Sequence, residues 1–193
     1  MSKIQWKGST LLAPVPAALV SCGTMENPNA LTVAWTGITC SDPPMTYISV
    51  RPERYSYEII KNSGEFVINL TTEKLTRACD YCGVVSGREV DKFAKTGLTP
   101  LAVEGVSAPG IAESPVNIAC RVVEERALGS HTLVLAEVVG VTADEKYMDE
   151  TGRFDINGTG LIMYSHGEYF GLGRKLGKFG YSVQKKKPRR RAK

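Results

Sequence analysis

The residues most suited to chemistry lie between positions 36 and 58. A polar stretch at 36–42, Thr-Gly-Ile-Thr-Cys-Ser-Asp, precedes Arg51 and Arg54, which flank a helical pattern with Ser56 as its expected N-cap. Hydroxyl and main-chain N–H groups at a helix N-terminus favour an anion, and an arginine adds a charge-assisted hydrogen bond of about 1.5–3 kcal/mol. The arrangement suits a phosphate group. The alternative interpretation is an ordinary turn with surface arginines.

The cysteines offer a second possible chemistry. Five are scattered through the chain, and Cys79 and Cys82 have the C-x-x-C spacing of a redox pair or of half a zinc site. No second C-x-x-C or paired histidine follows at metal-ligand spacing, so we expect no metal site. On a helix the two residues share one face, so packing also explains them.

The elements that would position these residues are mostly strands. Apolar and β-branched runs at 16–23, 30–38, 45–50, 65–70, 116–126 and 131–143 predict strands, with the turn at 128–131 joining the last two as a hairpin. Residues 56–63 predict a short helix that ends at Gly64, and 75–98 predicts helices at both ends of a polar Ser-Gly-Arg loop. Because no regular βαβ alternation occurs, the fold class is mainly β (α+β), an antiparallel barrel or sandwich with a few inserted short helices.

Length and charge limit the classes of protein further. With 193 residues and 42% hydrophobic content, the chain can form one substantial core, which we assign to a single domain at 1–183. Pro14 and Pro16 interrupt the only early apolar run, so we expect neither a leader nor a membrane span, and a cytoplasmic location. Seven of the last nine residues are Lys or Arg, which makes 184–193 a basic tail and leaves the folded part mildly acidic. Nucleic-acid binding by the folded part is therefore not expected.

Four segments in order resemble the flavin reductase-like, FMN-binding split-barrel family, with flavoredoxins as its nearest members. They are the run from Asn29 to Leu70 with its Pro-Pro and Arg-x-Ser/Thr patterns, CGVVSGREVDKFAKTGLTP at 82–100, LGSHTLVLAEVVGV at 128–141, and EYFGLGRKLGKFGYSV at 168–183. The likeness covers roughly residues 10–183. It implies an antiparallel Greek-key split β-barrel, a noncovalently bound FMN, and a homodimer with each flavin at the subunit interface.

The resemblance also implies which residues meet the flavin. The ring would contact Trp35, Thr36 and Gly37, the phosphoribityl side would contact Thr39, Cys40 and Ser41, and the phosphate would be held by Arg51, Ser56 and Tyr57. Asn29 opens the family pattern and counts as cofactor-binding, and the loop before the Asp-Lys-Phe motif would bring up Ser86, Gly87, Arg88 and Lys92. Cys40 stands where family members often have Ser, and Ser56 where many have Thr.

Two of these residues would affect the chemistry directly. Lys92 would stabilise negative charge at the pyrimidine end of reduced flavin, unless it is a solvated lysine paired with Asp91. His131 would face the ring where a donor approaches and is the candidate catalytic residue; its unperturbed pKa of about 6.5 allows both protonation states near neutrality. The alternative for His131 is a structural hydrogen-bonding role at the head of a strand.

The expected function is electron transfer by the flavin between NAD(P)H or a redox protein and an acceptor, as in a flavin reductase or an electron carrier. A non-catalytic FMN store or flavin sensor is the alternative, since fold alone does not exclude it. A third possibility gives the basic tail a role in binding nucleic acid or an anionic membrane.

Overall fold

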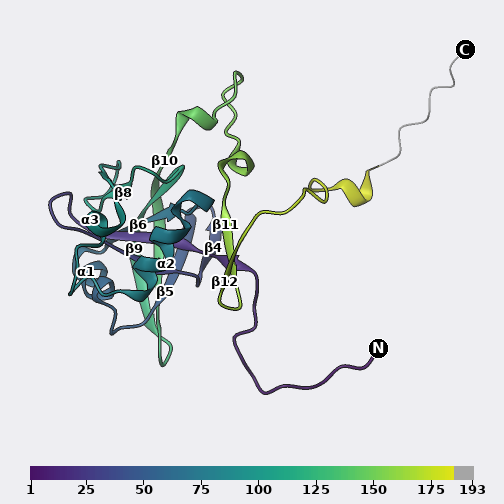
Figure 1. Cartoon of the computed structure of the whole chain (residues 1–193), viewed down its shortest axis with the longest axis horizontal. Coiled ribbons are helices and arrows are strands. Elements are labelled where there is room, and N and C mark those ends of the chain that lie inside the picture. Colours follow the sequence, from purple (N-terminus) through teal and green to yellow (C-terminus); the bar gives the residue numbers. More distant parts are fainter. Residues whose placement is uncertain (185–193) are drawn as a thin grey trace, which may run out of the picture.

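A seven-stranded antiparallel sheet forms the body of the protein in the computed structural model, which describes residues 1–184 (Figure 1). The basic tail predicted at 184–193 lies outside the described residues, apart from its first residue. The strand order is β3-β2-β6-β9-β10-β5-β4. These strands are β2 (Ala18–Gly23), β3 (Pro28–Val33), β4 (Thr36–Ser41), β5 (Pro44–Val50), β6 (Glu65–Leu70), β9 (Val116–Ala127) and β10 (Thr132–Ala143).

Smaller elements complete the fold. A three-stranded sheet contains β1 (Val15–Pro16), β11 (Ile162–Ser165) and β12 (Glu168–Gly171), and a two-stranded sheet contains β7 (Pro100–Leu101) and β8 (Gly110–Ile111). The α-helices are α1 (Tyr55–Ser63), α2 (Thr76–Val84) and α3 (Lys92–Thr96). The 3-10 helices are η1 (Glu73–Leu75), η2 (Glu145–Tyr147), η3 (Ile156–Thr159) and η4 (Tyr181–Val183). Within residues 1–184 no helix is long and apolar enough to cross a membrane.

The antiparallel strands, the β9–β10 hairpin and the two helices around the Ser-Gly-Arg loop confirm the sequence predictions. Gly64 ends α1 as expected, because its φ of 69° is the left-handed conformation that glycine adopts easily. The single strand predicted at 30–38 is wrong, since Ala34 and Trp35 separate β3 from β4. The backbone N–H of Ser49 donates to the Trp35 carbonyl at 2.9 Å, which brings this bend against the end of β5.

Strand β2 packs on both faces and divides the core. Val20 and Cys22 belong to the cluster inside the curled sheet, with Phe66 and Ile48. Leu19, between them in sequence, joins a second cluster under α2 and α3, because successive side chains of a strand point to opposite faces. The two helices are therefore held against the outer face of β2 and β3, beside the candidate site.

Candidate functional site

Three adjoining hollows follow the edge strand β3, with volumes of about 280, 160 and 390 Å³. Thr32 borders all three, Arg51 and Arg54 border the first two, and Trp35 borders the last two. We call this continuous depression the β3 groove. The curled sheet forms it by bringing the end of β3 beside the end of β5, while α2 covers the other side.

Two arginines and a helix start make one end of the groove positive. Arg51 and Arg54 lie in the loop between β5 and α1, and both side chains are exposed. The N-cap of α1 is Arg54, with no side-chain hydrogen bond to the helix start, so the prediction that Ser56 is the N-cap is wrong. Uncapped N–H groups and the helix dipole favour an anion at this end.

Ser56 lies instead inside the first turn of α1 and is buried. Its hydroxyl accepts a hydrogen bond of 2.7 Å from Asn29 Nδ2 on β3, and the same amide lies 3.6 Å from the Cys22 sulfur. Gly87 packs tightly on this pair, since a Cβ built on it would be 2.2 Å from Asn29 Oδ1. The predicted site residues Asn29, Ser56, Ser86 and Gly87 are thus close together at the positive end of the groove, three of them on its lining.

Lys92 is a buried cation in the wall of the groove. Only 4% of the residue is exposed, and its ammonium donates to the carbonyls of Ala30 at 2.7 Å and Cys82 at 2.8 Å. The alternative of a solvated lysine paired with Asp91 is wrong, because Asp91 caps α3 by accepting from the Ala94 N–H. Burial lowers the pKa of the Lys92 ammonium, and the neighbouring thiol of Cys82 opposes that shift.

Trp35 and His131 form an aromatic pair farther along the groove, with Trp35 at the junction of the second and third hollows. The Trp35 and His131 rings are 4.4 Å apart between centroids and inclined by 33°. Nδ1 of His131 lies 2.9 Å from the Ser130 hydroxyl, which leaves Nε2 free of hydrogen bonds to the described residues. Burial and the charge of Arg51 lower the pKa of His131, so the neutral imidazole is favoured at pH 7.

Other predicted site residues lie outside the groove of this chain. Thr36 donates to the Tyr47 carbonyl, and Gly37 packs beside the Tyr47 ring. Farther along β4 lie Thr39, Cys40 and Ser41, on the part of that strand that leads away from Trp35. Tyr57 donates to Glu125, on the β9 side of α1. The structure therefore separates this set from Arg51, Ser56 and Lys92 within one subunit.

Arg88 does not line the groove, although two of its contacts, Glu53 and Tyr55, do. Its guanidinium forms an ion pair with Glu58 at 3.0 Å, donates to the Glu53 carbonyl, and lies 5.1 Å from the centre of the Tyr55 ring. Both partners of the ion pair are more than half exposed. An exposed pair of this kind stabilises the fold little, so its observed role is to hold the 86–90 loop near α1.

The sequence interpretation missed several residues of the groove. Tyr164 and Tyr169 border its widest part, with ring centroids 5.5 Å apart, and the Tyr169 hydroxyl donates to Asp80 of α2 at 3.2 Å. Burial raises the pKa of Tyr169, which keeps it protonated. The sequence feature that could have indicated these tyrosines is the aromatic-rich SHGEYF segment. Its His166 and Gly167 both have positive φ and form the β11–β12 turn.

The two cysteines of the C-x-x-C pair are core residues and not reactive thiols. Cys79 and Cys82 are free, buried thiols of α2, and they contribute to the second core cluster. Burial raises the pKa of both, to about 11 for Cys82, which disfavours the reactive thiolate. Among residues 1–184 no group of three or more His, Cys, Asp or Glu side chains could hold a metal ion.

Comparison with known proteins gives one consistent family. The family described as "Flavin reductase like domain" matches residues 11–173. An uncharacterised protein of Archaeoglobus fulgidus is 33% identical over 159 residues, which is 82% of this chain and 88% of the relative. An uncharacterised protein of Pyrococcus abyssi is 29% identical over 140 residues, which is 72% of this chain and 80% of the relative.

Solved structures agree with this family. Flavoredoxin of Desulfovibrio vulgaris (Miyazaki F) is 33% identical, with a TM-score of 0.86 over 95% of this chain and all of the flavoredoxin. Flavoredoxin from Methanosarcina acetivorans is 26% identical, with the same TM-score and coverage. A split-barrel protein from Shewanella frigidimarina, 23% identical, has a TM-score of 0.77 over 87% of this chain and 86% of its own length. The predicted split-barrel fold is confirmed.

Proposed function

The chain belongs to the flavin reductase like family, and from that premise we propose that it binds FMN noncovalently in the β3 groove and transfers electrons with it. The observation that carries the proposal is the convergence of Arg51 and Arg54, an uncapped helix start and the buried ammonium of Lys92 on one groove. The arginines and the helix start fit the phosphate end of a ligand, and Lys92 fits a part of the ligand that becomes more negative on reduction.

The groove residues divide the binding work by chemistry. Arg51 and Arg54 supply exposed cations for a phosphate. Trp35 offers a flat apolar surface for the isoalloxazine ring, and His131 stands beside it as a neutral base. Lys92 lines the groove and has two of its three N–H groups bonded to backbone carbonyls, so one N–H remains as a donor for a ligand.

When bound, the flavin supplies the redox chemistry by accepting a hydride or electrons and passing them to an acceptor. The fixed charge of Lys92 favours the reduced, more negative state, because burial leaves little water to screen it. His131, whose Nε2 has no hydrogen-bond partner among the described residues, would hold or release a proton beside the bound ring. Tyr164 and Tyr169 border the largest hollow of the groove, where they would contact a donor that approaches from that side.

The first experiment is an absorbance spectrum of the purified protein, followed by release and identification of the chromophore. We expect oxidised flavin bands and FMN rather than FAD. The variant Arg51→Ala should retain less FMN and keep its fold, because this side chain is exposed, whereas the exposed control Arg153→Ala should behave like the wild type. A colourless protein that does not take up added FMN would refute the proposal.

Two kinds of flavoprotein remain to be separated by kinetics. Rapid mixing with NADH or NADPH reduces the flavin of a reductase quickly and that of an electron carrier slowly. The 33% identity to a flavoredoxin over the whole fold favours a carrier that receives electrons from a protein donor. A flavin that no physiological donor reduces would favour the alternative, a non-catalytic FMN store or sensor.

The proposal includes a homodimer in the cytoplasm. Thr39, Cys40 and Ser41 lie outside the groove of their own chain, which is explained if they face the flavin of a second copy. The extended terminal segments, which leave the body in Figure 1, expose Leu12, Phe179 and other apolar side chains that a second copy would cover. Light scattering should give twice the 21.0 kDa chain mass. A monomer that retains FMN would refute this part.

The proposed cytoplasmic location is supported by the five free thiols, which suit a reducing compartment.

A further inference from the structure

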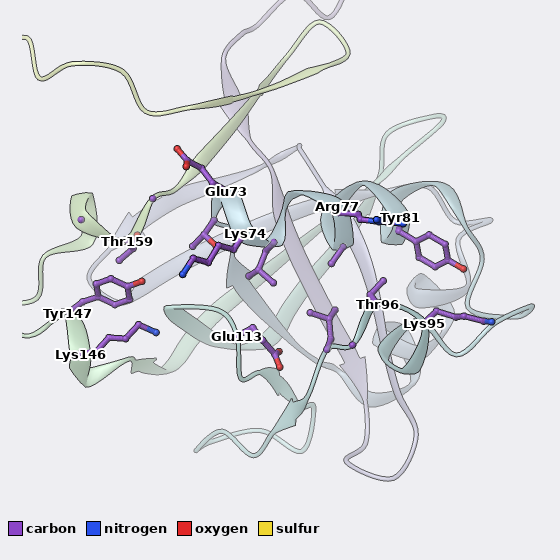
Figure 2. A pocket seen from close by; sticks show the side chains of 17 residues that line it. Glu73, Lys74, Arg77, Tyr81, Lys95, Thr96, Glu113, Lys146, Tyr147 and Thr159 are labelled. Atoms are coloured by element: carbon purple, nitrogen blue, oxygen red, sulfur yellow. The ribbon is translucent and has the colours of Figure 1, made fainter.

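A second cavity of about 830 Å³, shown in Figure 2, is lined by a different set of α2 residues from the β3 groove. The side chains of Arg77, Ala78 and Tyr81 on α2 border it, whereas Cys82 of the same helix borders the groove. The other walls come from η1, α3, η2 and η3. None of the residues assigned above to the flavin lines this cavity, which we call the basic pocket.

Positive charge dominates the basic pocket. Lys74, Arg77 and Lys95 line it and form no ion pair with any residue of the described chain, and Lys146 adds a fourth cation that is shared with Asp144. Lys74 and Arg77 come from the adjoining elements η1 and α2, and the fold adds Lys95 of α3 and Lys146 of η2 from farther along the chain. Positive charge of this kind around a cavity, with three of the four cations outside any ion pair of the described residues, attracts anions.

The two acidic side chains at the pocket offset part of this charge, but neither forms an ion pair with a cation of the pocket. Glu113 is engaged by the backbone, accepting a hydrogen bond of 3.1 Å from the Thr99 N–H. Glu73 points away from the cavity in Figure 2. Its carboxylate lies against Gly171 of β12, because a Cβ built on that glycine would be 2.6 Å from it. The ammonium groups of Lys74 and Lys146 instead extend toward the same region as the Tyr147 hydroxyl (Figure 2).

The floor of the pocket is apolar. Leu75, Ala78 and Leu98 line it and are buried members of the second core cluster. The volume falls within the range of about 300–1,000 Å³ that is typical of small-molecule sites. An apolar floor with cations around it suits a ligand that has both an apolar ring and anionic groups. We propose that the basic pocket binds a nucleotide or a similar organic phosphate, separately from the flavin.

The test is isothermal titration calorimetry of the flavin-loaded protein with three probes: ADP, pyrophosphate and adenosine. We expect ADP to bind, pyrophosphate to bind more weakly, and uncharged adenosine to give no measurable heat. Lys74→Ala and Arg77→Ala should each weaken ADP binding about tenfold or more, since each removes a charge-assisted contact. The matched control Lys61→Ala removes an exposed lysine of α1, outside the pocket, and should leave ADP affinity unchanged.

The flavin spectrum recorded during the same titration separates this inference from the proposed function. Binding of ADP with the flavin retained, and its loss in Lys74→Ala and Arg77→Ala, supports the basic pocket. Absence of ADP binding, or equal affinity in both variants and the wild type, overturns it. Release of flavin by ADP with no effect of either variant also overturns it, because ADP then competes in the β3 groove. A protein that lacks flavin but still binds ADP through Lys74 and Arg77 would refute only the proposed function.

Discussion

Replacing Gly87 with alanine tests the packing that holds the positive end of the β3 groove together. An alanine Cβ would be 2.2 Å from Asn29 Oδ1 and 3.0 Å from Tyr55 Cδ1, whereas real Cβ contacts are rarely below about 3.4 Å. Asn29 must then move by about 1 Å. The backbone of Gly87 does not have a positive φ, so the effect comes from the added methyl group alone.

The expected cost follows from what Asn29 would lose. Its amide donates to the buried hydroxyl of Ser56 at 2.7 Å, and breaking that bond leaves the amide only the weak acceptor Cys22 sulfur at 3.6 Å. We expect Gly87→Ala to lower the free energy of unfolding by about 1–3 kcal/mol, the usual range for a lost buried hydrogen bond or an overpacked site. For a chain of this length each kcal/mol lowers Tm by about 2–4 °C. FMN affinity should fall as well, because Gly87 and Ser56 both line the groove.

Denaturant unfolding of the flavin-free protein measures this cost, and flavin titration measures the affinity. Gly173→Ala is the control, since nothing lies within 4 Å of a Cβ at that position. Asn29→Ala removes the obstructing atom, so the double variant should be less destabilised than the sum of the two single variants. The reasoning is refuted if Gly87→Ala unfolds like the Gly173→Ala control, or if the effects of Gly87→Ala and Asn29→Ala simply add.

Three further predictions concern titratable groups. His131, with its pKa lowered by burial and by Arg51, should titrate below about 6.5 in an NMR experiment, and Arg51→Ala should move that midpoint upward. The unfolded chain binds the His131 proton more readily than the folded chain does, so the free energy of unfolding should fall as the pH drops below about 6.5. If the His131→Asn variant shows the same dependence of stability on pH as the wild type, this prediction is contradicted. Cys40 alone among the five thiols is not buried within its own chain, so it should be the one that reacts with a thiol reagent, and bound FMN should slow this reaction because Cys40 is proposed to face the flavin of a second copy; rapid reaction of Cys79 or Cys82 would reopen the redox interpretation.

Local sequence patterns predicted the elements well where neighbours in sequence determine the structure. The β9–β10 hairpin and the end of α1 at Gly64 depend on turn residues within a few positions, and both were predicted. The N-cap at Ser56 was wrong because Asn29, 27 residues earlier, forms a hydrogen bond with its hydroxyl and draws it into the core. No local pattern reports a partner at that separation, and the same holds for Tyr169 and Asp80.

Lys92 shows how a residue can be required by the fold and by the site at the same time. Strand β3 is an edge strand, so alternate carbonyls such as that of Ala30 face away from β2 and need a donor. Cys82 lies in the last turn of α2, whose free carbonyls and dipole favour a cation. One ammonium satisfies both and thereby joins the edge strand to the helix. Its adjacent Asp91 misled the sequence interpretation, because the need for a buried cation arises only after β3 and α2 have packed together. The charge that the proposed flavin would meet is therefore held in place by the fold's own hydrogen-bonding requirements.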